Sequence, residues 1–306
     1  MPNKLVWKDR SSGHEGYRIY RSTSFIPENA LPAALATVGP QTLEYTDNTV
    51  ARNVPYHYRV GVFKGNEESL SPDRVLAFMP YTGPGPQKLL RGTWENGYFG
   101  TFGLGELFDV DEFAAATGIV GLGTLRYFAT RWLKFVYKGK ILFFPDASFM
   151  ISVKASALYQ LGLAYGTDDQ SLWVDFLKTN YGIVPQNKKI QKGEEQFIVR
   201  FPRTRGVPMS ETTVQPDSYR GNEIDLCFAA AFTNLAYGKL PDATPSVDDI
   251  VNPESATFIT ADNMTTRNAN SMALRGGSGF DAIGGSIPWD NPNGNVGYRP
   301  VLELVM

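Results

Sequence analysis

Residues 3–79 alternate apolar and polar side chains in short segments that are separated by turn residues. Alternation with a period of two places one face of a strand in a core and the other face in solvent. Strands are therefore expected at residues 5–7, 16–22 and 56–62. Several short strands with turns between them are typical of an antiparallel β-sandwich.

The second part of the chain is richer in aromatic residues and contains longer β-prone runs. Residues 132–137 and 140–145 are two such runs on either side of Lys138-Gly139, which predicts a β-hairpin with a glycine turn. Residues 193–201 predict a further strand.

Two segments have helical features. Residues 156–162 read as a short helix that ends at a glycine. Within residues 221–232, the side chains of Ile224, Cys227, Phe228 and Ala231 follow the i, i+3, i+4, i+7 spacing of a buried helix, and Asn222 is a candidate N-cap.

Proline and glycine mark the junction between the two patterns. The segment PYTGPGPQ, residues 80–87, suits neither a helix nor a central strand. We therefore expect one domain over residues 1–80, a short semi-rigid linker over 81–87 and a second domain over 88–306.

The last third of the chain is loop-rich before it becomes strand-like. Residues 241–270 are rich in Pro, Asp, Thr and Asn, which predicts a surface loop with one short strand at 257–260. The motif LRGGS, residues 274–278, then precedes a polar loop. The segment GYRPVLEL, residues 297–304, predicts a closing strand that returns through the core.

The N-terminal segment resembles a fibronectin type III domain. The residues that carry this resemblance are Trp7, the GYRIYRS strand, LEYTDNTV, VPYHYRVGVF and EESLSP. The strand with the tryptophan is usually the second in that family, and here it begins almost at Met1. The resemblance therefore implies an unpaired sheet edge beside Leu5, and we expect another chain or a later segment of this one to pair there.

The C-terminal segment resembles a C-type-lectin-like domain of the sulfatase-modifying-factor type, a group that includes receptor-binding proteins of bacteriophages. The structural signature consists of Arg275, Gly276 and Gly277 in LRGGS and of Gly297, Tyr298 and Arg299 in GYRPVLEL. The segments GYFG, WLKF, LFFP and LYQLGLAYGT lie within residues 91–306, and through them this part of the chain also resembles the large domain of phage tail and virion proteins. Together, the resemblances imply a mostly β protein with an α+β part: a fibronectin III-like sandwich followed by a C-type-lectin-like domain.

Composition narrows the function classes. The chain has 306 residues, 42% hydrophobic and 20% charged, and its net charge of −2 gives no attraction to nucleic acid or anionic membranes. No apolar leader and no run of roughly 20 apolar residues is present, so we expect no membrane insertion. The single cysteine, Cys227, excludes an internal disulfide and fits folding in a reducing cytoplasm.

Several enzyme classes lack the residues that they need. One cysteine cannot supply the paired thiolates of a copper-dependent sulfatase-modifying oxidase. The only histidines, His14 and His57, lie in the first domain, which excludes a Ser-His-Asp hydrolase in the second and disfavours a zinc site. Paired carboxylates such as Asp168-Asp169 and Asp248-Asp249 leave a polysaccharide-degrading glycosidase as an alternative.

A calcium site has only weak support. The tripeptide at residues 215–217, Gln-Pro-Asp, coincides with one that galactose-type C-type lectins use for calcium and sugar. The residues around Asp290 have a similar character, but Asn293-Gly294 explains them as a hairpin turn. We therefore expect neither a metal nor a cofactor.

The expected function is non-enzymatic, with no catalytic residues. Binding candidates are the aromatic and polar side chains of the C-terminal loops, because aromatic rings stack on sugars and anchor interfaces; core packing of the two aromatic residues is the alternative. These candidates are Arg267, Phe280, Trp289, Asp290, Asn291 and Asn293.

The resemblances imply a structural component of a bacteriophage particle, in the tail, fibre, baseplate or head surface. The protein would be made in the host cytoplasm and would be located in the virion. Its partners would be other virion proteins or further copies of itself, with a host-surface glycan or receptor as a further partner. A carbohydrate- or receptor-binding adhesin, recognising its ligand through residues 241–295, is the alternative within the binding class.

Overall fold

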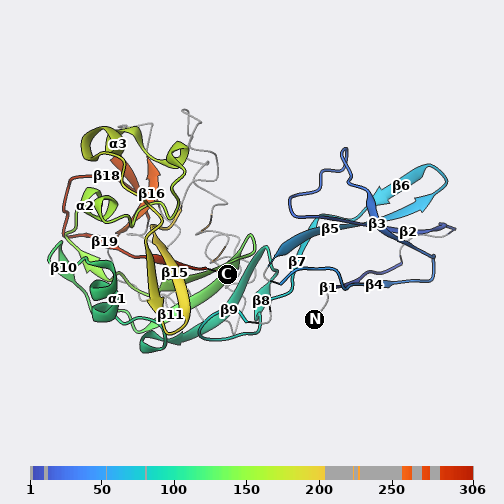
Figure 1. The fold of residues 1–306 in the computed structure, drawn as a ribbon, viewed down its shortest axis with the longest axis horizontal. Helices are drawn as coiled ribbons and strands as arrows, with labels where there is room; N and C mark the ends of the chain where they lie inside the picture. The colour runs from blue at the N-terminus through green and yellow to red at the C-terminus, as the bar shows by residue number, and fades with distance from the viewer. Residues whose placement is uncertain are drawn as a thin grey trace. The chain divides into compact units, whose positions relative to one another are not determined.

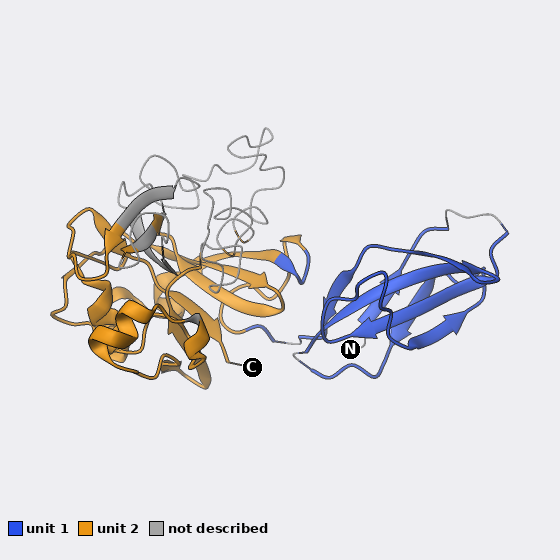
Figure 2. Ribbon diagram, turned by 90° about the horizontal axis from the view of Figure 1, so that it is seen from above, with its two compact units in different colours: residues 1–82, 93–96, 306 blue, residues 83–92, 97–305 orange. Residues whose placement is uncertain are grey.

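The computed structural model describes residues 3–9, 13–52, 54–79, 81–203, 223, 227, 257–263, 271–275 and 283–305. They form a mostly β protein with several antiparallel sheets, which confirms the coarse fold class expected from the sequence. The chain divides into two compact units (Figure 2). The sandwich unit comprises residues 1–82, 93–96 and 306, and the large unit comprises residues 83–92 and 97–305.

The described strands of the sandwich unit form two sheets (Figure 1). They are β1 (Asn3–Val6), β2 (Gly16–Ser22), β3 (Ala34–Val38), β4 (Glu44–Asp47), β5 (Pro55–Lys64), β6 (Glu67–Leu70) and β7 (Arg74–Ala77). β1 pairs with β4 in a two-stranded sheet. In the second sheet β3, β2, β5 and β6 are successive neighbours, and β7 also pairs with β5. Every strand pair in both sheets is antiparallel.

The core of the sandwich unit lies between its two sheets. Leu5 of β1, Ile19 of β2 and Tyr58 of β5 form its buried centre. The hydrophobic residues packed around this centre are only partly buried, because two strands are too few to cover the wider sheet opposite. These residues are Trp7, Leu35, Ala36, Val38, Tyr45, Tyr56, Val60 and Leu76.

A buried carboxylate links the two sheets of the sandwich unit. Asp47 of β4 accepts hydrogen bonds of 2.8 Å from the Tyr58 hydroxyl and from the Arg21 guanidinium. The backbone N–H and the hydroxyl of Thr49 donate to its other oxygen, at 2.9 and 2.8 Å. Asn3 of β1 donates to the Tyr58 hydroxyl at 3.2 Å, so the network reaches the first strand. The sandwich is held by polar as well as apolar contacts.

β1 has a strand neighbour on one side only, among the residues that the structure describes. Its register with β4 runs from Asn3 opposite Asp47 to Val6 opposite Glu44. The edge expected beside Leu5 is therefore present in the described part of the chain, and no later described segment pairs along it. Whether another chain pairs there remains a prediction.

The first sheet of the large unit contains the end of the chain in its interior. The strand order is β14, β15, β20, β12, β11, β9 and β8. Their bounds are β8 (Arg91–Gly92), β9 (Asn96–Gly103), β11 (Arg131–Tyr137), β12 (Lys140–Pro145), β14 (Lys189–Lys192), β15 (Glu195–Arg200) and β20 (Val301–Leu304). β15 confirms the strand predicted within residues 193–201.

The β11–β12 hairpin is confirmed. Lys138 and Gly139 form its turn with φ values of 48° and 76°, and a positive φ at both central residues is the pattern of a type I′ turn. Residues 132–136 and 141–145 are buried without interruption. Continuous burial means that both faces of these strands are covered, unlike the one-sided alternation of the sandwich unit.

The second sheet of the large unit has the strand order β10, β13, β19, β16, β17 and β18. Their bounds are β10 (Thr124–Leu125), β13 (Met150–Ile151), β16 (Thr257–Asn263), β17 (Ser271–Arg275), β18 (Ile283–Pro288) and β19 (Val296–Tyr298). The β16–β19 pair is parallel, and the other pairs are antiparallel. β16 confirms the strand predicted at residues 257–260.

Short helices connect the strands of the large unit. They are η1 (Leu104–Glu106), α1 (Val110–Thr117), α2 (Ala155–Gln160), η2 (Gln170–Leu172) and α3 (Asp175–Tyr181). Asp109 and Glu112 form a reciprocal capping box at the start of α1, and Gly118 ends that helix with a φ of 83°. α2 confirms the short helix expected at residues 156–162. None of the helices in the described part of the chain is long and apolar enough to cross a bilayer.

Some predicted segments cannot be compared with the structure. Of the helix expected at residues 221–232, only Glu223 and Cys227 are described, and both are helical. The proposed cap Asn222 lies outside the described residues. The loop expected at 241–270 also lies outside them, apart from 257–263.

The closing segment differs from the single strand that was expected. β19 belongs to the second sheet of the large unit, whereas β20, two residues later, belongs to the first. Pro300 stands between them, and proline lacks the N–H that a continuous ladder needs. Residues 294–295 make a turn before β19, but β18 and β19 do not pair with each other, so the hairpin predicted at Asn293-Gly294 is wrong.

Candidate functional site

The predicted binding residues fall into two groups. Arg267 and Phe280 lie outside the described residues, as do Gly276 and Gly277 of the structural signature. The remaining candidates lie in residues 289–295, which connect β18 to β19. We call this segment the 289–295 loop and treat it as the candidate site.

Trp289 is fully buried, so the expectation of an exposed sugar-stacking ring is wrong for this residue. Its indole stacks on Phe201 with ring centroids 6.5 Å apart and planes at 28°. Its carbonyl oxygen accepts a 3.0 Å hydrogen bond from the Ser156 N–H at the start of α2. Trp289 therefore anchors the loop to the core, which is the packing alternative that the sequence left open.

Asp290 ties the 289–295 loop to two helices. Its carboxylate accepts hydrogen bonds from the Ser156 hydroxyl of α2 and from the Tyr181 hydroxyl at the end of α3. The hydrogen bond to Asp290, together with desolvation, raises the pKa of Tyr181. Because the carboxylate holds two hydroxyl groups, it orients the loop and is partly engaged before any ligand arrives.

The rest of the loop presents polar groups to solvent. Asn291, Asn293 and Asn295 are exposed. The Asn293 side chain accepts a 2.8 Å hydrogen bond from the Asn295 N–H, and the Val296 N–H donates to the Asn293 carbonyl at 3.1 Å. A tight turn thus displays exposed amides above the anchored residues Trp289 and Asp290. Such groups can form hydrogen bonds to a polar ligand, but they provide no reacting group.

The GYR residues of the signature have structural roles. A Cβ atom on Gly297 would lie 2.2 Å from the Ser148 hydroxyl, so only glycine fits there. Tyr298 is fully buried, which raises the pKa of its hydroxyl. The buried Arg299 guanidinium donates to the Asp146 carbonyl at 3.1 Å. Arg275, the last residue of β17, pairs with Phe258 and Ile283.

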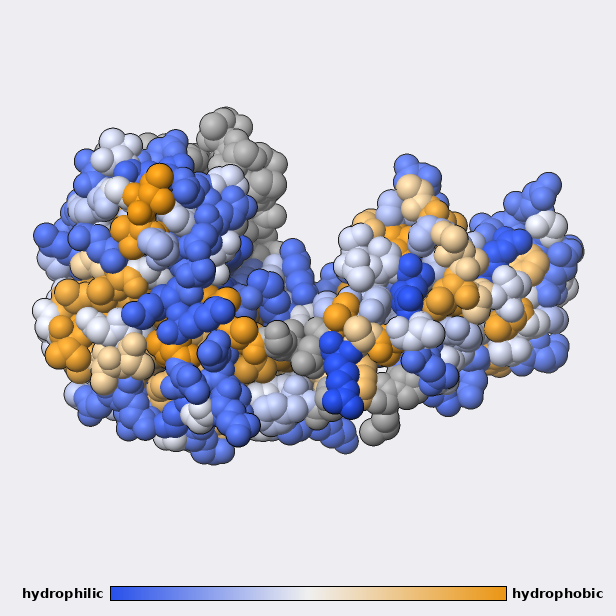
Figure 3. Space-filling model, viewed as in Figure 1, coloured by the Kyte–Doolittle hydropathy of each residue, from blue (hydrophilic) through white to orange (hydrophobic). Residues whose placement is uncertain are grey.

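Sequence reasoning missed an apolar patch on the large unit. Val120, Tyr127 and Phe128 are 66%, 63% and 47% exposed, and they flank the edge strand β10. We call these three residues the apolar patch. Figure 3 shows hydrophobic side chains gathered at the end of the large unit that carries α1 and β10. The run Arg126-Tyr127-Phe128 could have indicated this patch. Its aromatic residues do not follow the spacing of a strand or helix with one buried face.

The aromatic rings of the apolar patch are held in place. The Tyr127 hydroxyl donates a 2.8 Å hydrogen bond to Asp111 of α1. The Arg126 guanidinium lies 4.3 Å from the centroid of the Phe128 ring. Ordered, exposed aromatic side chains resemble the anchor residues of protein interfaces.

Sequence reasoning also missed Lys134, a buried lysine within the apolar strand β11. Its side chain is fully buried, and its ammonium donates to the carbonyl oxygens of Gly83, Pro84 and Pro86 at 3.1, 2.8 and 2.8 Å. Burial lowers the pKa of Lys134 to about 7. Its position in the middle of the apolar run 132–136 was the feature of the sequence that could have indicated a buried lysine.

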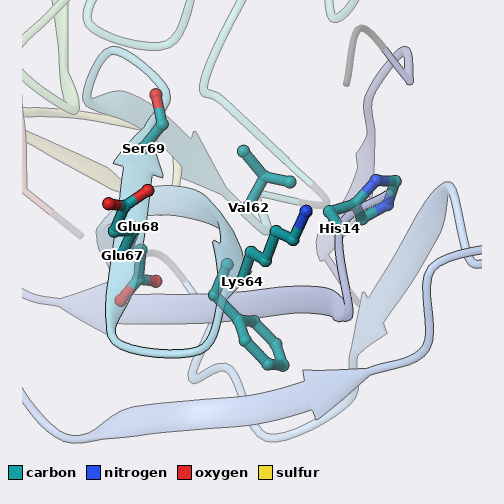
Figure 4. A pocket seen from close by; sticks show the side chains of 7 residues that line it. His14, Val62, Lys64, Glu67, Glu68 and Ser69 are labelled. Atoms are coloured by element: carbon teal, nitrogen blue, oxygen red, sulfur yellow. The ribbon is translucent and has the colours of Figure 1, made fainter. Parts of the chain in front are cut away.

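The pockets of the described residues include a small one in the sandwich unit (Figure 4). Its volume is about 280 Å³. It is lined by His14, Val62, Phe63, Lys64, Glu67, Glu68 and Ser69. In Figure 4, Lys64 extends toward His14, while Glu67 and Glu68 lie on the neighbouring strand β6. Glu68 already accepts hydrogen bonds from Arg18 and Tyr20, so its charge is compensated within the fold.

Both histidines contact neighbouring side chains in the sandwich unit. The His14 ring is half-buried and lies 4.8 Å from the Tyr17 ring. His57 Nδ1 lies 2.5 Å from Asp73 Oδ2. This contact links the histidine on β5 to the loop that precedes β7. Within the described residues, no group of three or more His, Cys, Asp or Glu side chains is placed to hold a metal ion.

A further ionisable cluster lies inside the large unit. Arg200 of β15 forms hydrogen bonds of 2.8 and 2.6 Å to the two carboxylate oxygens of Glu223, and one of 3.2 Å to Glu303 of β20. The Cys227 thiol is buried, and desolvation together with Glu223 raises its pKa. A buried thiol with a raised pKa is a weak nucleophile.

The chain matches none of the protein-family models, curated proteins or solved structures with which it was compared.

Proposed function

We propose that the chain is a non-enzymatic structural component of a bacteriophage particle, located in the tail, fibre, baseplate or head surface, that works through protein–protein contacts. The observation that carries the contact role is the apolar patch of Val120, Tyr127 and Phe128. Exposed, fixed aromatic residues beside a strand edge lose solvent on association, and apolar burial is the main driving force of such contacts.

The fold supports the proposal at a finer level. The sandwich unit has a two-stranded sheet packed on a wider antiparallel sheet, in keeping with a fibronectin III-like module that lacks a strand beside β1. In the large unit, the GYRPVLEL segment connects two sheets in the core. Its buried GYR residues fit the C-type-lectin-like domain that the sequence resembles.

Mass spectrometry of purified particles tests the proposal. The particles are those of the phage whose genome encodes this chain, banded by density and treated with protease inhibitors. We expect peptides of the chain at a fixed copy ratio to the major capsid protein. Peptides that are abundant in the infected-cell lysate but missing from the banded particles would contradict a virion role.

The exposed amides of the 289–295 loop favour a second candidate function, binding of a host-surface glycan. Asn291 and Asn293 offer donors and acceptors on a turn that Trp289 and Asp290 hold in place. Binding to intact host cells or to a glycan array, compared between the parent and Asn291→Ala, tests it. We expect the variant to bind more weakly and Gln41→Ala, an exposed amide in the sandwich unit, to bind like the parent. Equal binding by Asn291→Ala would remove the loop from consideration.

A further inference from the structure

The outer edge of β1 has backbone groups that no described residue satisfies. In an antiparallel pair, alternate residues direct both their N–H and their C=O toward the partner strand. The Trp7 N–H donates to the Leu43 carbonyl at 3.0 Å, and the register pairs Leu5 with Tyr45. Because every second residue behaves like Trp7, the backbone N–H and C=O groups of Asn3 and Leu5 also point toward β4. Lys4 and Val6 direct their backbone groups away from it.

The side chains at this edge are also accessible. Val6 is 70% exposed, which is the largest exposed fraction among the large hydrophobic residues that the structure describes. The Lys4 side chain is 53% exposed and forms an ion pair with Glu44 across the β1–β4 pair. On the opposite face of the strand, Leu5 is buried in the sandwich core. An incoming strand would thus meet free backbone groups, an exposed apolar side chain and the margin of a hydrophobic core.

The β3, β6 and β4 edges of the sandwich unit carry features that oppose strand addition. β3 has a register shift against β2 between Ile19 and Tyr20, and such irregularities twist an edge away from new partners. β6 carries Glu67 and Glu68. On the free side of β4, the outward-directed residues are the polar Glu44 and Thr46. At the edge of β1, pairing also buries an exposed apolar side chain, Val6.

We propose that β1 pairs antiparallel with β1 of a second copy of this chain, so that the two-stranded sheets of both copies join into one four-stranded sheet. The register follows from the outward groups. With Leu5 opposite Leu5 of the second copy on the twofold axis, Lys4 lies opposite Val6 and Val6 lies opposite Lys4. All four outward groups of each strand then form hydrogen bonds, and both leucines face the core side.

Charge selects this register over its neighbour. A shift by one pair would place Lys4 directly opposite Lys4 of the second copy, and like charges directly opposite each other destabilise a sheet. In the proposed register, the aliphatic part of Lys4 instead covers the exposed Val6, and its ammonium remains beside Glu44. The edge of β1 is therefore complementary to itself.

This inference rests on the proposed function, because the pairing has a biological role only where copies of the chain lie side by side in a particle. Taken alone it is a short contact, far below the roughly 800 Å² per partner of a standard interface. We expect self-association with a Kd on the order of 0.1–1 mM in solution, strengthened by multiple attachment in an assembly.

Two proline variants of the full chain test the proposal. Val6→Pro removes an outward N–H of β1 without removing a β1–β4 hydrogen bond. Thr46→Pro is the matched control, because the Thr46 N–H points out from the free side of β4. Sedimentation velocity over a concentration series should show the same dimer for the parent and for Thr46→Pro, with at least a tenfold rise in Kd for Val6→Pro.

Amide hydrogen exchange on the parent supplies an independent readout. The Lys4 and Val6 amides should become protected as the concentration rises through the Kd, while the Lys64 and Gly65 amides in the β5–β6 turn should not change. Dimerisation of Val6→Pro with the Kd of the parent would overturn the proposal. A parent that stays monomeric to about 1 mM with rapidly exchanging Lys4 and Val6 amides would also overturn it.

Protection of these two amides only within purified particles would overturn pairing between copies and assign the edge to a strand of another protein. The particle mass spectrometry keeps the two proposals separate. A chain that is present in the particles but monomeric and unprotected retains the proposed function and loses this inference. A chain that forms the dimer in solution but is missing from particles retains this inference and loses the proposed function.

Discussion

The ammonium group of Lys134 lies 2.8 Å from the carbonyl oxygen of Pro84 and is fully buried in the large unit. It also donates to the carbonyls of Gly83 and Pro86, so its three N–H groups are all used. The rings of Phe99 and Phe143 lie 5.1 and 5.7 Å from the nitrogen. A lysine with no carboxylate partner among the described residues thus fixes the proline- and glycine-rich segment onto β11.

Lys134→Met should loosen this segment. The substitution leaves three carbonyl oxygens without their donor, and we expect a loss of about 1–3 kcal/mol in the free energy of unfolding of the large unit. Urea denaturation followed by tryptophan fluorescence measures the loss. Faster exchange of the Gly85 and Gln87 amides should accompany it. Lys154→Met, at an exposed lysine, should leave both measurements at the parent values.

The same lysine predicts a pH dependence of stability. Its pKa is lowered from 10.5 to about 7 by burial. Between these two values the unfolded chain binds more protons than the folded chain, so the free energy of unfolding rises with pH. The cost of burying the charge is full below pH 7 and is relieved above it.

This contribution should have a slope of up to about 1.4 kcal/mol per pH unit. Because Lys134→Met lacks it, the difference in the free energy of unfolding between the parent and the variant should grow from pH 7 to pH 9. Parallel pH profiles for the two proteins would show that Lys134 keeps an ordinary pKa.

Asp47 should be the acid-sensitive group of the sandwich unit. Burial opposes its ionisation, but hydrogen bonds from Thr49, Tyr58 and Arg21 outweigh that effect and lower its pKa. A carboxyl with a lowered folded pKa stabilises the fold above its unfolded pKa, and this stability disappears as the pH falls through the folded value. Acid should therefore weaken the link between the two sheets.

Asp47→Ala removes the centre of that network, so the Arg21 guanidinium and the Tyr58 hydroxyl lose the buried carboxylate that accepts from both. We expect a loss of about 3–5 kcal/mol in the free energy of unfolding at neutral pH, as is typical of a broken buried pair. Thermal unfolding monitored by circular dichroism measures it. Glu44→Ala, at an exposed ion pair on the same strand, should cost less than about 1 kcal/mol. Equal costs for the two variants would argue against the network.

Gly297 and Ser148 should be coupled through space. Gly297→Ala places a methyl group 2.2 Å from the Ser148 hydroxyl and 2.7 Å from its Cβ, and such overpacking costs about 1–3 kcal/mol. Ser148→Gly opens this space, so the double variant should recover part of the loss in a double-mutant cycle. Gly294→Ala is the control, because a Cβ atom there would lie at an ordinary 3.5 Å from its nearest neighbour, the Ser152 hydroxyl. Additive losses at Gly297 and Ser148 would contradict the coupling.

The apolar patch should matter for assembly and not for folding. Phe128→Ser removes an exposed ring, so we expect a change of less than about 0.5 kcal/mol in the free energy of unfolding. In particles made with this variant, the copy number of the chain should fall several-fold by quantitative mass spectrometry. Ile183→Ser, at an exposed residue that is not part of the patch, should assemble like the parent. Normal incorporation of Phe128→Ser would exclude the patch from the particle contacts.

Local signals were sufficient for several elements. The β11–β12 hairpin and its Lys138-Gly139 turn could be predicted because two β-prone runs around a glycine leave few other structures available. The strand at 16–22 was predicted from the alternation of apolar and polar side chains, and the short strand at 257–260 was also predicted. The closing segment could not be assigned correctly, because one continuous apolar pattern conceals the change of sheet at Pro300.

Exposure was harder to predict than secondary structure. Trp289 and Phe128 both occur in polar or glycine-containing loop sequence, yet Trp289 stacks on Phe201 in the core and Phe128 is exposed. Nothing near either residue in the sequence distinguishes them. The difference depends on which distant segment packs against each ring.

The sequence by itself determined that this is a mostly β protein, because period-two alternation and glycine turns act within a few residues. It also determined that one cysteine and two histidines leave few chemistries available to the chain. Only the tertiary structure decided that Lys134 is buried against backbone carbonyls, that Asp47 joins two sheets and that β1 has a free edge within the described part of the chain. These are contacts between residues far apart in the chain, and packing in three dimensions selects them.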